Sequence, residues 1–133
     1  MNIVGKVFEF NGEKHKVIAQ KNMDFVVLEN TTNNPAVLGD IEILCNAKIN
    51  NDGFIKGSPS YYFGLTKTDI YNKIREKIKG RVEKSGLFGL KKKTIPPIDV
   101  NDTRGIANAL HKDYYKIPVE HLELIVTAYQ NNM

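Results

Sequence analysis

The sequence predicts an α+β fold, in which an N-terminal antiparallel β-meander or small open barrel of about five short strands precedes three α-helices. Hydrophobic residues alternate with a period of two in the first half of the chain and recur every three to four positions in the second. The length of 133 residues is typical of one domain. We therefore expect a single domain over 1–133, with a β-rich part at 1–65 and a helical part at 66–133.

The first strands are predicted from a hairpin signal. Asn11-Gly12 stands between the apolar-alternating runs 7–10 and 14–18, and this dipeptide suits a type I′ turn because both central residues need positive φ. Residues 25–28 are all apolar and predict a third, more buried strand. Residues 30–40 are rich in Asn and Thr and predict a loop.

The clearest strand covers residues 41–49. Ile, Ile, Cys, Ala and Ile occupy every second position there, which predicts a half-buried strand with one apolar face. Cys45 belongs to the apolar set, so we expect a small buried side chain rather than a nucleophile. A turn at 50–53 then leads to short strand segments on either side of a break at 57–59, the second of them at 61–63.

The pattern changes to a helical one after Thr66. Isoleucine or valine recurs every four positions, which predicts an amphipathic helix over 67–85. Thr66 followed by Asp69 resembles a capping box. Ser85-Gly86 suits the end of this helix, and Gly80 is a position at which it could end or bend earlier.

Two further helices are predicted after the connector 86–98, whose Pro96-Pro97 favours extended chain. Asn101 or Asp102 can cap the first, and Ile117-Pro118 opens the second. We expect the two to pack as a helical hairpin against the sheet or against a second copy. Three apolar stripes exceed what a small sheet can cover, so we expect a homodimer or higher homo-oligomer.

Positive charge is concentrated in the middle of the chain. Residues 64–94 hold 10 basic and 3 acidic side chains, whereas residues 1–63 hold 6 and 7, and residues 95–133 hold 3 and 5. A concentrated basic segment attracts anions such as nucleic acid, nucleotide phosphates or acidic protein surfaces. The alternative is a solvated surface, because 16 of the 19 cations are lysines.

The candidate ligand-binding residues are cations and aromatic residues of this segment, together with one arginine beyond it. Cations near exposed rings can hold a phosphate and stack a base. If Tyr61 and Tyr62 lie in a strand, they face opposite sides and one is exposed for stacking. Arg104 can bind an anion as a bidentate fork, or else form a surface salt bridge to Asp99 or Asp102. The full set is Tyr61, Tyr62, Lys73, Arg75, Lys77, Arg81, Phe88, Lys91, Lys92, Lys93 and Arg104.

Two apparent nucleic-acid motifs are weak. Residues 86–89 have the Gly-x-x-Gly spacing of the KH loop, but their middle pair is apolar, so we interpret them as a tight hairpin whose Leu and Phe fold into the core. A membrane- or partner-touching tip is the alternative. The C-terminal helix pair suggests a helix-turn-helix, but its second helix begins with Glu120, His121 and Glu123, which suits packing better than DNA reading.

Motifs of the common enzyme classes are absent from the sequence. It has no P-loop, dinucleotide fingerprint, zincin motif or nucleophile elbow. The three histidines and one cysteine lie far apart, so neither a metal site nor a cofactor is expected. The sequence has no signal peptide and no apolar run of about 20 residues, so we expect a cytoplasmic protein with no membrane partner.

These observations lead to ranked hypotheses. The short, lysine- and asparagine-rich composition is similar to that of accessory proteins of phages and mobile elements. The first hypothesis is a non-enzymatic binding protein that holds an anionic ligand through its basic 67–93 segment, either a sequestered nucleotide-type small molecule or nucleic acid. The second is a protein–protein inhibitor that blocks a host defence enzyme. The third is an uncharacterised hydrolase or transferase.

Overall fold

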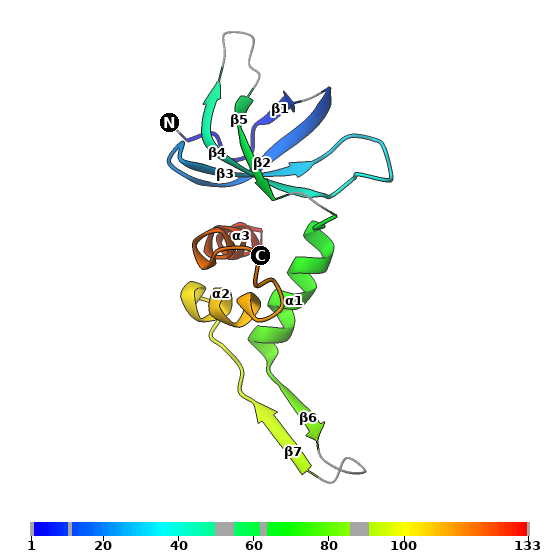
Figure 1. The fold of residues 1–133 in the computed structure, drawn as a ribbon, viewed down its shortest axis with the longest axis vertical. Helices are drawn as coiled ribbons and strands as arrows, with labels where there is room; N and C mark the ends of the chain where they lie inside the picture. Colours follow the sequence, from blue (N-terminus) through cyan, green and yellow to red (C-terminus); the bar gives the residue numbers. More distant parts are fainter. Residues whose placement is uncertain (1, 11, 50–54, 62–63, 86–90, 133) are drawn as a thin grey trace.

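The computed structural model describes residues 2–10, 12–49, 55–61, 64–85 and 91–132. Five antiparallel strands in the order β1-β2-β3-β4-β5 form a curled half-barrel, which is followed by three helices and a separate strand pair, β6–β7 (Figure 1). The α+β architecture with an N-terminal meander is therefore confirmed. The elements are β1 Val7–Phe10, β2 Glu13–Lys21, β3 Phe25–Asn30, β4 Ile41–Ile49, β5 Ile55–Tyr61, α1 Lys67–Lys79, β6 Arg81–Ser85, β7 Lys91–Ile95, α2 Thr103–His111 and α3 Val119–Asn131.

The predicted first hairpin is present. Phe10 lies opposite Glu13 in the β1–β2 register, and Gly12 between them has a φ of 78°. A positive φ is what the Asn-Gly signal predicts, because glycine adopts it without a Cβ clash. The register and the conformation of Gly12 therefore agree with the local signal in the sequence.

Strand β4 differs from its prediction, because it is buried on both faces rather than one. Ile41 and Ile43 pack toward the helices, whereas Leu44 and Ala47 pack inside the curl of the half-barrel. The change of face coincides with a register irregularity and with Asn46 at a φ of 54°. A bulge of this kind shifts the alternation by one residue, which the period-two pattern cannot reveal.

Strand β5 runs through the predicted break at 57–59. Gly57 lies so close to β4 that a Cβ there would be 2.9 Å from the carbonyl oxygen of Cys45. This glycine therefore allows two backbones to approach inside the sheet and does not end a strand. Cys45 itself is half-buried, in agreement with a packing position.

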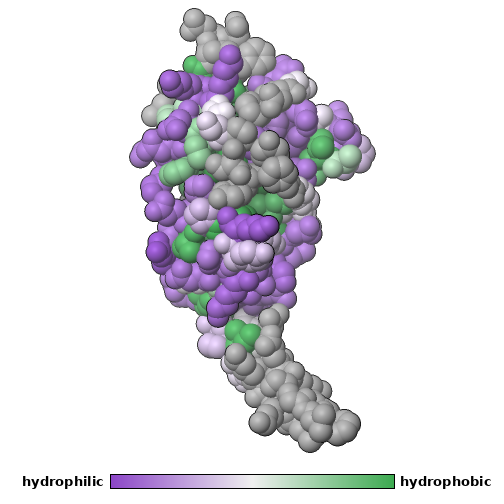
Figure 2. Space-filling model, viewed as in Figure 1, coloured by the Kyte–Doolittle hydropathy of each residue, from purple (hydrophilic) through white to green (hydrophobic). Residues whose placement is uncertain are grey.

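The two apolar faces of the sheet support two cores. The larger core lies between the sheet and the helices, and the smaller one lies inside the curl. We call the half-barrel and the three helices together the body. On the face in Figure 2, hydrophilic residues cover most of the body, and hydrophobic residues form small patches. Members of the larger core include Ile18, Val27, Ile43, Ile74, Leu110, Leu122 and Ile125.

Helix α1 is capped as predicted but ends earlier. The Thr66 hydroxyl oxygen accepts a hydrogen bond from the Asp69 amide at 3.2 Å. The helix stops at Lys79, because Gly80 adopts a φ of 69° and the chain then enters β6. The prediction of one helix over 67–85 is therefore wrong in its last third, and the early end at Gly80 is correct.

Helices α2 and α3 form the predicted hairpin and pack against the sheet of the same chain. Asp102 caps α2 by accepting a hydrogen bond from the Gly105 amide at 3.0 Å, and Pro118 directly precedes α3. Helix α3 contacts β2 and β3, and α2 contacts both α3 and α1. The apolar stripes of these helices are thus covered within one chain. The predicted homo-oligomer remains a prediction, but the excess of apolar helix surface no longer supports it. None of the described helices is both long and apolar enough to cross a membrane.

Candidate functional site

The basic segment divides into two structurally different parts, and the first is α1. Three of its lysines form ion pairs with carboxylates: Lys67 with Glu29 at 2.7 Å, Lys73 with Glu76 at 3.4 Å, and Lys77 with Asp113 at 3.0 Å. The Lys77 side chain is only 15% exposed. Most of the positive charge of this helix is therefore balanced inside the body of the protein.

Arg75 also has a partner, although not a carboxylate. Its guanidinium carbon lies 5.9 Å from the centre of the Tyr129 ring of α3, within the range of a cation–π contact. Tyr129 packs edge-on against Tyr71 with ring centres 5.2 Å apart. Burial raises the pKa of Tyr71 to about 12, so this phenol stays neutral. Arg75 thus covers the contact between α1 and α3.

Arg104 forms a surface ion pair, with a partner other than the two expected. Its Nη1 lies 2.6 Å from Oε1 of Glu123 on α3. Asp102 instead caps the start of α2. The Arg104 side chain remains 66% exposed, so the pair ties α2 to α3 at the surface and is separate from the basic segment.

The second part of the basic segment is the two-stranded ribbon of β6 and β7, which we call the arm. Its strands are antiparallel, with Lys84 opposite Lys92, Glu83 opposite Lys93, and Ser85 opposite Lys91. The ten residues of the two strands include five cations and one carboxylate. Figure 1 shows the arm extending from the far end of α1, away from the half-barrel. These strands were not predicted from the sequence, because Val82 continues the four-residue spacing of the isoleucines in α1.

The base of the arm is tightly packed around Gly80. A Cβ at this position would lie 2.6 Å from the carbonyl oxygen of Ile95 and 2.7 Å from the nitrogen of Pro97. The Ile98 amide donates a hydrogen bond to the Lys77 carbonyl at 3.2 Å, which joins the returning chain to α1. The body therefore sets the direction in which the arm leaves it.

The predicted site residues do not form one cluster. Tyr61 ends β5, opposite Ile43, and α1 begins a few residues later. The arm starts at the other end of that helix, about 20 Å away at 1.5 Å per residue. Arg81, Lys91, Lys92 and Lys93 all belong to the arm, where Arg81 is opposite Ile95 at the base and Lys91 is opposite Ser85 at the other end of the ribbon. Tyr62 and Phe88 lie outside the described residues.

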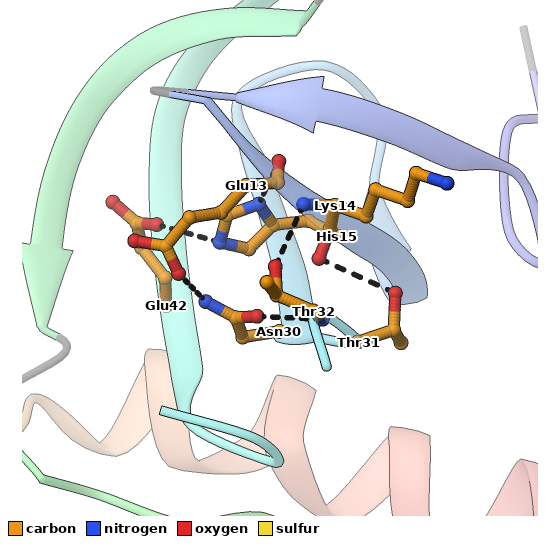
Figure 3. Close-up of polar contacts among 7 residues, drawn as sticks. All are labelled: Glu13, Lys14, His15, Asn30, Thr31, Thr32 and Glu42. Carbon is orange, nitrogen blue, oxygen red and sulfur yellow. Dashed lines mark hydrogen bonds and ion pairs between the residues drawn. The ribbon is translucent and has the colours of Figure 1, made fainter. Parts of the chain in front are cut away.

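A buried polar cluster joins β2, β3 and β4, and no sequence signal indicated it (Figure 3). His15 Nε2 lies 3.7 Å from a Glu42 oxygen, and Nδ1 donates to the Glu13 carbonyl oxygen at 3.2 Å. Asn30 donates a hydrogen bond to the Glu13 carboxylate. Its own side-chain oxygen accepts from the Thr32 amide at 2.9 Å. The cluster therefore connects three strands at one end of the sheet.

The electrostatics of this cluster favour neutral forms. Burial, assisted by the charge of Glu13, raises the pKa of Glu42 to about 7. Burial also lowers the pKa of His15, so both groups favour their neutral forms. An acid–base pair results, but His15 and Glu42 are only 5% and 8% exposed. A substrate would have little access to either group, so we interpret the cluster as structural.

Metal binding has no support in the described part of the chain, where no group of three or more histidine, cysteine or acidic side chains is arranged to hold an ion. Comparisons with protein-family models, with curated proteins and with solved structures found no match to this chain. The arm, with its dense positive charge at the end of a rigid helix, is therefore the candidate site that the chain's own geometry supports best.

Proposed function

We propose that this chain is a non-enzymatic nucleic-acid-binding protein that holds phosphates with its arm. The observation that supports this most is the unequal balance of charge along one basic segment. Three lysines of α1 have carboxylate partners on other elements or on the helix itself, whereas the two strands of the arm have five cations for one carboxylate. An excess of one sign, presented away from the body, attracts ligands of the opposite sign.

The register of the arm strengthens this argument. Lys84 and Lys92 occupy directly opposite positions, and like charges at such positions destabilise a strand pair. An isolated two-stranded ribbon is itself only marginally stable in water. Bound phosphates would offset both costs, because they neutralise the lysines in the state where the ribbon is formed. The opposed lysines therefore destabilise the free arm but stabilise its complex with a polyanion.

The shape of the arm favours a polymer over a single nucleotide. A five-residue strand extends about 15 Å, which matches the spacing of several consecutive phosphates. A sequestered small molecule requires a concave pocket that encloses most of its surface, whereas a projecting ribbon is convex. We therefore propose nucleic acid as the ligand, and nucleotide sequestration and protein inhibition become outcomes of the test.

The test compares two triple variants with equal loss of charge. K91Q/K92Q/K93Q neutralises the arm, and K14Q/K16Q/K21Q neutralises three exposed lysines of β2. Binding is measured by fluorescence anisotropy with labelled single-stranded and duplex DNA of about 20 nucleotides per strand, between about 50 and 200 mM salt. We expect the arm variant to lose at least about tenfold in affinity, with a salt slope shallower by about 2 to 3. The β2 variant should stay close to wild type.

Two results would overturn this proposal. One is the absence of binding by the wild-type protein to either DNA at low salt. The other is an equal loss in both triple variants, which would indicate a general charge effect. Retention of a nucleotide through gel filtration, with a raised melting temperature, would support sequestration instead. Salt-independent binding to a protein partner would support an inhibitor.

A further inference from the structure

The arm places lysine on both of its faces. Opposite residues of an antiparallel pair share a face, and neighbouring residues along a strand alternate between faces. The position shared by Lys84 and Lys92 therefore belongs to one face. The positions of Lys91 and Lys93, opposite Ser85 and Glu83, belong to the other. Lysine on both faces restricts the shape of the anionic surface that can contact all of these residues, whereas a basic patch on one face does not.

We infer that the arm lies in the major groove of double-stranded DNA, with phosphates on both of its sides; this inference rests on the proposed function. A flat anionic surface would contact one face and leave the lysines of the other in solvent. A groove bounded by two phosphate backbones contacts both. The major groove of B-form DNA is about 12 Å wide and admits a two-stranded ribbon.

Duplex RNA fits this geometry less well. Its major groove is deep and narrow, and proteins read A-form helices mainly across the shallow minor groove. Single strands are usually held by stacking on aromatic rings, and the ten strand residues of the arm include no aromatic residue. Both comparisons favour duplex DNA over the other nucleic acids.

The packing at the base of the arm holds the start and the end of the ribbon against α1. Gly80 leaves no space for a side chain against Ile95 and Pro97, and Ile98 is hydrogen-bonded to the end of α1. The arm therefore leaves the body in a defined direction, which lowers the entropic cost of insertion into a groove.

The composition of the arm predicts binding with little sequence preference. Bidentate recognition of a base edge depends mainly on Arg, Asn or Gln, and the two strands offer a single candidate, Arg81. Lysines act as point charges that contact phosphates and carry no sequence information directly. We therefore expect affinity for duplex DNA to vary little between unrelated sequences.

The test neutralises the two faces separately. K84Q/K92Q removes both lysines of one face, and K91Q/K93Q removes two lysines of the other, so the change in charge is identical. We expect each pair to weaken duplex DNA binding by about tenfold and to reduce the salt slope by about 2. Wild-type protein should bind duplex DNA at least tenfold more tightly than single-stranded DNA or duplex RNA of the same sequence.

The outcomes separate this inference from the function on which it rests. A large loss in one pair and none in the other would overturn groove insertion while leaving nucleic-acid binding intact. Equal affinity for duplex and single-stranded DNA, or a preference for duplex RNA, would do the same. No binding to any of the three probes would overturn both proposals. A Glu83→Gln variant, which removes the carboxylate opposite Lys93, should bind duplex DNA severalfold more tightly.

Discussion

The body and the arm manage electric charge in opposite ways. In the body, formed by the half-barrel and the three helices, charged groups form ion pairs between elements, as Lys77 and Asp113 do, and the buried groups His15 and Glu42 favour their neutral forms. In the arm, five cations accompany one carboxylate, and two lysines lie directly opposite each other. The same basic segment thus contributes to fold stability in its first half and carries surplus charge in its second.

The basic residues of this one segment therefore lie in two structurally different elements, a packed helix and a projecting ribbon. Charge on a helix that packs against acidic loops contributes to structure, and its removal should cost stability. Under the proposed function, removal of charge from the arm should change affinity for the ligand more than stability. We therefore expect substitutions in the body to change stability with little effect on affinity for DNA, and substitutions of the arm lysines to change affinity with little effect on stability.

The largest expected effect on the body is a change of stability with pH that arises from Glu42. The Glu42→Gln variant should lack this change. The pKa of Glu42 rises from 4.5 to about 7 on folding, so the folded state prefers the protonated carboxyl. The stability from this group is present below pH 4.5 and is lost as pH rises through 7. At about 1.4 kcal/mol per pH unit over the interval from 4.5 to about 7, the loss is about 3–4 kcal/mol. Urea unfolding at several pH values measures it.

His15 changes the stability of the fold with pH in the opposite direction to Glu42, because burial lowers the pKa of His15 below 6.5. Its contribution is present above pH 6.5 and is lost as pH falls further, so the Glu42 effect is cleanest between about pH 6.5 and 7.5. We expect wild-type stability to fall across that window and Glu42→Gln stability to stay level. A wild-type curve that is flat there would contradict the burial argument. Affinity for DNA should not differ between the two proteins.

The next effect concerns the junction between body and arm. Gly80→Ala places a methyl group 2.6 Å from the Ile95 carbonyl oxygen at a φ of 69° and should cost about 1–3 kcal/mol. Gly64→Ala is a matched control, since Gly64 has the same φ of 69° and open space around it. Only backbone strain, about 1 kcal/mol, is expected there. Equal losses in urea unfolding would show that the base of the arm is not crowded.

The smallest effect separates paired from solvent-facing lysines. Lys77→Gln removes the 3.0 Å contact with Asp113 from a side chain that is 15% exposed, and we expect a loss of about 1 kcal/mol. Lys79→Gln, at an exposed position of the same helix, should stay within about 0.5 kcal/mol of wild type. Thermal unfolding of both variants makes the comparison, and a larger loss for Lys79→Gln would contradict a stabilising role of the Lys77–Asp113 ion pair.

Much of the local structure was predictable because its signals act over a few residues. The Asn-Gly hairpin, the Thr66 cap and the Asp102 cap depend on contacts between near neighbours in the chain. The end of α1 was harder, because Val82 fits the helical period and only its pairing with Thr94 makes it part of a strand. The charge excess of the middle segment was visible from composition, but its division between helix and arm was not.

The sequence by itself determined the fold class, the turn and capping residues and the concentration of basic residues, because all of these are properties of short stretches or of totals. Tertiary structure alone decided which lysines meet a carboxylate, how β4 changes face at Asn46, and which side chains surround His15. These outcomes depend on contacts between residues far apart in the chain. Electrostatic energy and burial depend on distance in space, and a linear pattern does not contain that distance.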